Sequence, residues 1–183
     1  MLIDKTYFIG EINVAGANVP GSAVLESLAL FINKREPEYL ELSLGYSFNE
    51  LFQAGIADID GRWFDLRTGT TYVDHKGITR NWKGLQQSGQ LSPIANYIYY
   101  WYMSDAVTLT TTLGEMQTTS ENAKVAASGF KMAKAWNEMA EQTKTMHDFL
   151  LNKVDDTGII VYPEFSHREV RHNDVIKYIG ALL

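Results

Sequence analysis

The chain has 183 residues, of which 45% are hydrophobic and 21% charged, and its formal net charge is −6. A chain of this length removes about 70% of its extended surface from water on folding, so we predict one domain with a single core over residues 1–183. The absence of cysteine excludes a disulfide framework, a thiol nucleophile and a Cys-ligated metal site. The acidic balance, with scattered Lys and Arg, argues against tight binding of nucleic acid.

Neither a signal peptide nor a membrane span is expected. The N-terminal stretch MLIDKTYFIGEINVAG lacks a basic segment followed by a long apolar run. The most apolar run, Ile94 to Met103, contains four tyrosines and is far shorter than the roughly 20 residues that a membrane-spanning helix requires. We therefore expect a soluble protein that does not associate with membranes.

Two helices in series are predicted between residues 22 and 55. Ser22 suits the N-cap of the first helix, Pro37 the first position of the second, and Gly55 its end. Gly45 inside the second helix costs about 1 kcal/mol relative to Ala and indicates a close neighbouring backbone. Apolar residues recur at helical spacing in both segments: Val24, Leu25, Leu28 and Ile32, then Leu40, Leu44, Phe48, Leu51 and Phe52. We interpret the pair as a helical hairpin.

Residues 61–85 are predicted to form a projecting loop or hairpin. The stretch is polar and paced by Gly69, Gly77 and Gly84, and it is much longer than the about 2–8 residues that usually connect packed helices. Such a connection is functional, disordered or a misread element. Disorder fits poorly, because several large apolar side chains in it require burial: Leu66, Tyr72, Val73, Ile78, Trp82 and Leu85.

The segment SPIANYIYYWYMSD predicts a helix that Ser92 caps and that runs from Pro93 toward Asp105. Its apolar and aromatic side chains surround the whole circumference, which is typical of a helix buried on every side. It is either the central helix of the fold or partly buried by another chain. The β-branched segment AVTLTTTLGEMQTT that follows indicates a strand or an extended arm.

The longest helix is predicted from Ser120 to about Asn152. Its apolar side chains form one stripe, made of Val125, Met132, Trp136, Met139, Met146, Phe149 and Leu150. We favour an intramolecular core for this stripe over an adaptable, methionine-rich partner surface. A short strand, GIIVYPEF, comes next. The tail, residues 166–183, is charged at first and then predicts a small apolar helix from about Asn173.

No catalytic motif, cofactor site or metal site is predicted. The sequence has no phosphate-binding loop, dinucleotide fingerprint, zinc-peptidase motif or nucleophile elbow, so we expect a protein that is not an enzyme. His167 and His172 are the best metal candidates, but their spacing places them on different sides of a helix and on opposite faces of a strand, which favours a solvated tail. The aromatic run at 97–102 has no interleaved basic residue, which a single-strand nucleic-acid binder requires.

An acidic stretch resembles part of a calcium loop. Asp58, Asp60 and Asp65 lie in DIDGRWFD, which lacks the carboxylate that an EF-hand supplies at the twelfth loop position. We therefore predict a turn at Asp60 and Gly61.

Six segments occur along the chain in this order: KREPEYLELSLGY, LRTGTTYVDHKGITRNWKGL, SPIANYIYYWYM, TTLGEMQTTSENA, KMAKAWNEM and VYPEF. Together they resemble a group of small proteins encoded in the structural modules of phages and prophages of Bacteroides-type bacteria, similar in role to head–tail connector (adaptor) proteins. The resemblance covers about residues 20 to 165 and includes no catalytic motif.

The resemblance implies a mainly α subunit with a body of about four helices, a projecting hairpin and a short C-terminal strand and helix. Such subunits form a homo-oligomeric ring, typically twelvefold, between the portal protein and the tail or a second ring. The location implied is the neck of the virion, and the host cytoplasm during assembly. DNA passes through such a ring without tight binding, which agrees with the acidic balance.

In this interpretation residues 61–85 form the arm that reaches a neighbouring subunit, and residues 166–183 form a docking tail. Interface cores favour Trp and Tyr, so we predict a subunit interface made by Tyr72, Trp82, Leu85, Ile176, Tyr178 and Ile179. Two alternatives stay open: a non-catalytic helical module that binds a host or phage partner, and an enzyme with an unrecognised site near Asp58, Asp60 and the two tail histidines. The long helix from Ser120 departs from the commonest adaptors.

Overall fold

The computed structural model describes residues 1–87, 92–111, 114–117, 128–168 and 170. Within these residues the fold has five α-helices and two small antiparallel hairpins, so the predicted mainly α class is confirmed. Two 3-10 turns, η1 (Lys5–Tyr7) and η2 (Gly10–Ile12), precede the helices. No described helix is long and apolar enough to span a bilayer.

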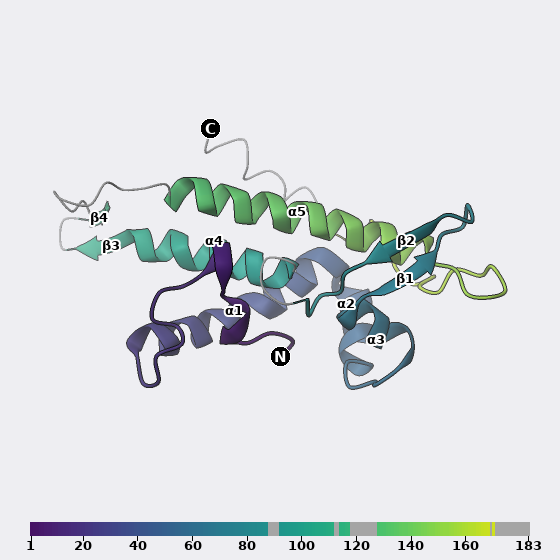
Figure 1. The fold of residues 1–183 in the computed structure, drawn as a ribbon, viewed down its shortest axis with the longest axis horizontal. Helices are drawn as coiled ribbons and strands as arrows, with labels where there is room; N and C mark the ends of the chain where they lie inside the picture. The colour runs from purple at the N-terminus through teal and green to yellow at the C-terminus, as the bar shows by residue number, and fades with distance from the viewer. Residues whose placement is uncertain (88–91, 112–113, 118–127, 169, 171–183) are drawn as a thin grey trace.

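Three long helices form the body, and α4 (Pro93–Val107) lies between α1 (Ala23–Leu44) and α5 (Ser128–Asn152) (Figure 1). The predicted start of α4 is confirmed, because the Ser92 hydroxyl oxygen accepts the N–H of Ala95 at 3.2 Å. Its first turns are buried all round by the same chain: Ile94, Ala95, Tyr97, Ile98, Tyr99 and Tyr100. The prediction of a central helix is therefore confirmed.

The stripe of α5 belongs to the core, as predicted. Its buried members are Trp136, Met139, Met146, Phe149 and Leu150, and Met132 is partly buried. The helix ends at Asn152, also as predicted. Residues 120–127, with the expected start of the helix and Val125, lie outside the described residues.

The helical hairpin predicted between residues 22 and 55 is wrong, because α1 continues through Pro37. A proline inside a helix removes one hydrogen bond and costs about 3 kcal/mol, which packing on both sides of it offsets here: Leu28, Ile32, Tyr39, Leu40 and Leu44 are all buried. The break comes at Gly45, whose φ of 79° suits glycine. The Gly45 N–H bonds the Glu41 carbonyl at 3.0 Å, and α2 (Tyr46–Ala54) begins there.

Residues 61–85 contain the predicted hairpin, and part of the segment is buried against the body. They comprise α3 (Gly61–Thr68), β1 (Thr70–Val73) and β2 (Thr79–Trp82), and the two strands pair antiparallel. Gly69 lies just before β1 and Gly84 follows β2, and the two backbones come close there. A Cβ on Gly84 would stand 2.4 Å from the carbonyl carbon of Thr68. The glycine spacing marks a close approach of two backbones.

The segment predicted as a strand or extended arm is the second hairpin, β3 (Thr108–Thr111) and β4 (Gly114–Gln117). Figure 1 shows β3 continuing α4 beyond the end of the bundle. The predicted strand at 158–165 is wrong in extent, because Ile160 forms only an isolated bridge with Val154 there. The predicted tail helix, with Ile176, Tyr178 and Ile179, lies outside the described residues.

Candidate functional site

Tyr72, Trp82 and Leu85, which we predicted to need a neighbouring subunit, are buried within their own chain. The Trp82 ring stacks on Phe149 with centroids 5.9 Å apart, and its Nε1 donates to the Leu66 carbonyl at 2.9 Å. Tyr72 meets the same phenylalanine edge to face at 5.1 Å. The interface assignment of these three residues is therefore wrong. Phe149 of α5, which is distant in sequence, covers Tyr72 and Trp82 within the same chain.

Two turns share one sequence pattern. DHKGI at residues 74–78 joins β1 to β2, and DDTGI at residues 155–159 joins residues 153–154 to residues 160–161. In the first, the Asp74 carboxylate accepts the N–H groups of Lys76 and Ile78, both at 2.9 Å. In the second, the Asp155 carboxylate accepts those of Thr157 at 2.8 Å and Ile159 at 3.0 Å. Each turn therefore holds its two flanking segments in antiparallel register.

Asp74 also binds Arg80, and this contact sets its ionisation. Nε of Arg80 donates to the buried carboxylate at 2.7 Å. The bond from Arg80, followed by the backbone N–H of Ile78, lowers the pKa of Asp74 to about 2. The carboxylate therefore stays ionised in the folded protein at neutral pH.

The two turns join four short segments into one antiparallel arrangement, which we call the end sheet: β2, β1, residues 153–154 and residues 160–161. The Val154 N–H donates to the Val73 carbonyl at 3.3 Å, and the Val161 N–H to the Lys153 carbonyl at 3.0 Å. Each segment runs antiparallel to the one before it. In Figure 1 the end sheet lies at the end of the molecule opposite β3 and β4.

Contacts with α3 fix the outer part of the end sheet. Lys153 forms an ion pair with Asp65, and Arg62 donates to Glu164 at 2.9 Å and to the Val161 carbonyl at 3.2 Å. The hydrogen bond from Arg62 lowers the pKa of Glu164. Burial, with the nearby Asp65 charge, raises the pKa of Tyr162, so its hydroxyl remains a donor.

Several apolar side chains of the end sheet are exposed to solvent. Val73 and Ile78 are 46% and 50% exposed, and Ile159 and Ile160 are 65% and 43% exposed. Val73, Val154 and Ile160 face each other across adjacent segments. Sequence reasoning missed Ile159 and Ile160. The repeated Asp-x-x-Gly-Ile pattern is the signal that could have found both hairpins, since Asp and Gly at these offsets favour tight turns.

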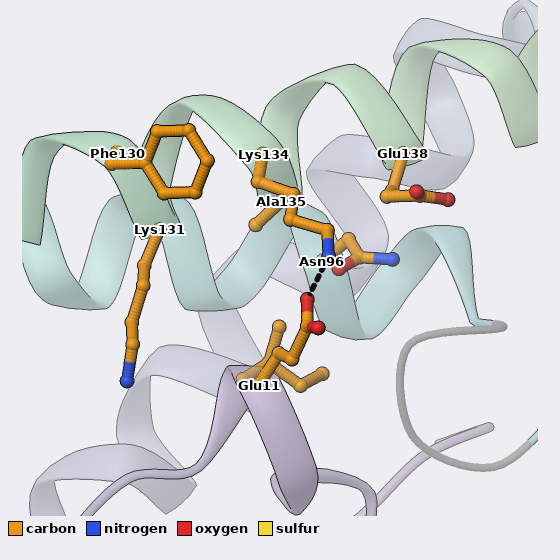
Figure 2. A pocket seen from close by; sticks show the side chains of 8 residues that line it. Glu11, Asn96, Phe130, Lys131, Lys134, Ala135 and Glu138 are labelled. Carbon is orange, nitrogen blue, oxygen red and sulfur yellow. Dashed lines mark ion pairs between the residues drawn. The ribbon is translucent and has the colours of Figure 1, made fainter.

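A pocket of about 240 Å³ lies between η2, α4 and α5 (Figure 2). Its lining combines Ile12, Asn96 and Ala135 with charged groups, and Glu11 forms an ion pair with Lys134 across it. Phe130 stands beside the opening with 72% of its surface exposed. This volume is below the roughly 300–1,000 Å³ of a pocket for a drug-sized molecule.

The metal candidates do not come together in the part of the chain that the structure describes, where no group of three or more His, Asp and Glu side chains could hold an ion. His167 packs edge to face against His147, with centroids 5.2 Å apart, and His172 lies outside the described residues. Asp65 pairs with Lys153, and Asp60 precedes α3.

Comparison of the chain with protein-family models, with curated proteins and with solved structures gave no match.

Proposed function

We propose that this protein is a structural subunit of a phage or prophage particle, a head–tail connector that forms a homo-oligomeric ring between the portal protein and the tail or a second ring. The resemblance of the six ordered sequence segments supports this function. The observation that carries it is the long α4–α5 pair with the β3–β4 hairpin extending past its end (Figure 1).

The hairpin β3–β4 is suited to reach a neighbouring subunit. Its strands pair with each other, Thr108 opposite Gln117 and Thr111 opposite Gly114, and form a sheet of two strands. Neither strand has a second pairing partner among the described residues, and a free strand edge is a template for pairing with another chain. This hairpin takes over the role of the arm that the sequence had placed at residues 61–85.

The test is to replace residues 108–117 with a Gly-Ser linker of the same length, which preserves the connection from α4 to α5. The hairpin lies beyond the core, so helical circular dichroism and the melting temperature should match those of the wild type. Sedimentation velocity should show that the wild type assembles and the variant does not. Equal assembly of the two proteins would contradict the proposed role of the hairpin.

The pocket in Figure 2 favours one other function, a non-catalytic module that binds a host or phage partner. Its apolar floor and charged rim could receive one side chain of that partner. A binding module of this kind is expected to stay monomeric until it meets its partner. The mass of the purified protein in solution therefore separates the two functions.

A further inference from the structure

Among the described residues, nothing pairs with either outer edge of the end sheet. Beside the turn between β1 and β2, the Asp74 N–H donates to the Ile78 carbonyl at 2.9 Å, so Asp74 and Ile78 are a hydrogen-bonded pair. Because hydrogen-bonded and non-hydrogen-bonded pairs alternate along an antiparallel ladder, the backbone N–H and C=O groups of Thr79 and Asn81 point away from β1. The structure describes no strand on that side of β2.

The opposite edge is open at Ile160. The Asp155 N–H bonds the Ile159 carbonyl at 2.9 Å, and the Val161 N–H bonds the Lys153 carbonyl at 3.0 Å. These two bonds flank the pair of Val154 and Ile160, so the backbone groups of Ile160 point away from the sheet. Ile160 is also partly exposed as a side chain, so both its backbone and its side chain are available to a partner.

The directions of the four segments make the two edges complementary. Each segment runs antiparallel to its neighbour, so β2 and residues 160–161, first and fourth in the order, run in opposite directions. If a second copy is added in the same orientation, its β2 lies antiparallel to residues 160–161 of the first. The antiparallel order then continues across the two molecules.

The charges beside the two edges are also complementary. Lys76 and Lys83 are exposed just before and just after β2, whereas the exposed Asp156 lies in the turn before residues 160–161. If Ile160 stands opposite Thr79 of the next copy, Lys83 of that copy lies opposite Asp156. Opposite charges at the margin of an interface raise the association rate and fix the register.

We infer that β2 of one copy adds to residues 160–161 of the next copy, joining the end sheets of successive subunits head to tail. This inference rests on the proposed ring and names one contact within it. A head-to-tail contact uses two different surfaces of the same molecule and closes a ring when its rotation permits. The partner is therefore a second copy of this chain, and both exposed edges become covered.

Disulfide cross-linking tests this contact, because the chain has no cysteine of its own. Thr79→Cys and Ile160→Cys are made as separate proteins, mixed and mildly oxidised. A disulfide-linked dimer is expected in the mixture and in neither protein alone. Within one chain the two positions are three strand spacings apart, about 14 Å, which is too far for a disulfide, so a chain carrying both should form a ladder of linked copies.

A charge exchange provides the second measurement. Lys83→Glu should weaken association about fivefold in sedimentation velocity, and Asp156→Lys in the same chain should restore it. The control, Lys144→Glu, makes the same charge change on the exposed side of α5 and should have no effect.

Three results would overturn the inference. Wild-type rings without a disulfide in the mixture would place the contact elsewhere and leave the proposed function standing. Dimers of equal yield in either single-cysteine protein would show a two-fold contact. A wild-type chain that never assembles would overturn both the contact and the ring.

Discussion

Trp82 shows how a single side chain in a polar segment becomes part of the core. Its indole N–H donates to the Leu66 carbonyl, its ring stacks on Phe149, and only 2% of its surface is exposed. Burial of a large aromatic ring is stabilising when its polar atom keeps a hydrogen bond. The residue therefore stabilises the monomer.

Trp82→Ala is predicted to lower the free energy of unfolding by about 3–5 kcal/mol, because it leaves a cavity beside Phe149. Urea unfolding followed by circular dichroism measures the change. Phe130→Ala is the matched control, since that ring is 72% exposed and its loss should change stability by less than about 0.5 kcal/mol. A small loss for Trp82→Ala together with failed assembly would instead return Trp82 to a subunit interface.

Asp74→Asn is predicted to destabilise the protein at pH 7, and the difference should shrink in acid. The folded pKa of Asp74, about 2, lies below the usual value near 4. The stabilisation is therefore complete above about pH 4 and is lost as the pH falls toward 2. Urea unfolding from pH 7 to pH 2 compares the variant with the wild type, with Asp148→Asn as an exposed control. A gap that stays constant over this range would contradict the prediction.

For single residues, the sequence predicted which side chains are buried better than it predicted which part of the chain covers them. The methionine stripe was assigned to the core from its spacing, and the tyrosines of α4 were expected to be buried, by this chain or by another. Tyr72 and Trp82 also required burial, but the surface that covers them comes from Phe149 of α5, and no local pattern connects these positions. Contacts between distant parts of a chain depend on the tertiary arrangement, which periodicity does not encode.

Among the elements, α1 departs most from the sequence prediction. Pro37 suits the first position of a helix, yet it lies in the interior of α1. Tertiary packing overrides the local preference here, because α1 buries apolar side chains on both sides of the proline. The actual boundary at Gly45 follows from a positive φ, which the residue type permits but does not require.

Pro37→Ala is predicted to raise the free energy of unfolding by about 1–2 kcal/mol. The substitution restores the missing hydrogen bond of α1, and the greater freedom of the unfolded chain offsets part of the gain. Pro20→Ala is the control, because that exposed proline lies in a turn and its replacement restores no helical hydrogen bond. Thermal and urea unfolding measure both variants. A destabilised Pro37→Ala protein would show that the proline fits α1 without cost.

Across the whole molecule, α4 and α5 connect two small sheets at opposite ends (Figure 1). The β3–β4 hairpin extends from one end, and the end sheet closes the other with open edges and exposed isoleucines. An elongated subunit with a different pairing surface at each end is suited to repeated association. The exposed edges are a liability in a monomer and become covered in an assembly.

The C-terminal residues 173–183 are predicted to dock on another protein of the assembly. Val170 packs against the core, and the apolar residues after it can bury one face only by docking on something. Deleting residues 173–183 should leave the helical circular dichroism largely intact and, if the proposed ring forms, weaken its attachment to the adjoining ring. Global unfolding of the shortened chain would show that this segment belongs to the core of the subunit.

The central claim is that this chain assembles into a closed ring, and native mass spectrometry with electron microscopy of the purified protein tests it most directly. The protein is measured alone and, if a gene for a portal protein lies beside its own, after co-expression with that portal protein. We predict ring-shaped particles whose mass is a single whole-number multiple of the chain mass. A monomer under both conditions, or open filaments without closed rings, would contradict the account.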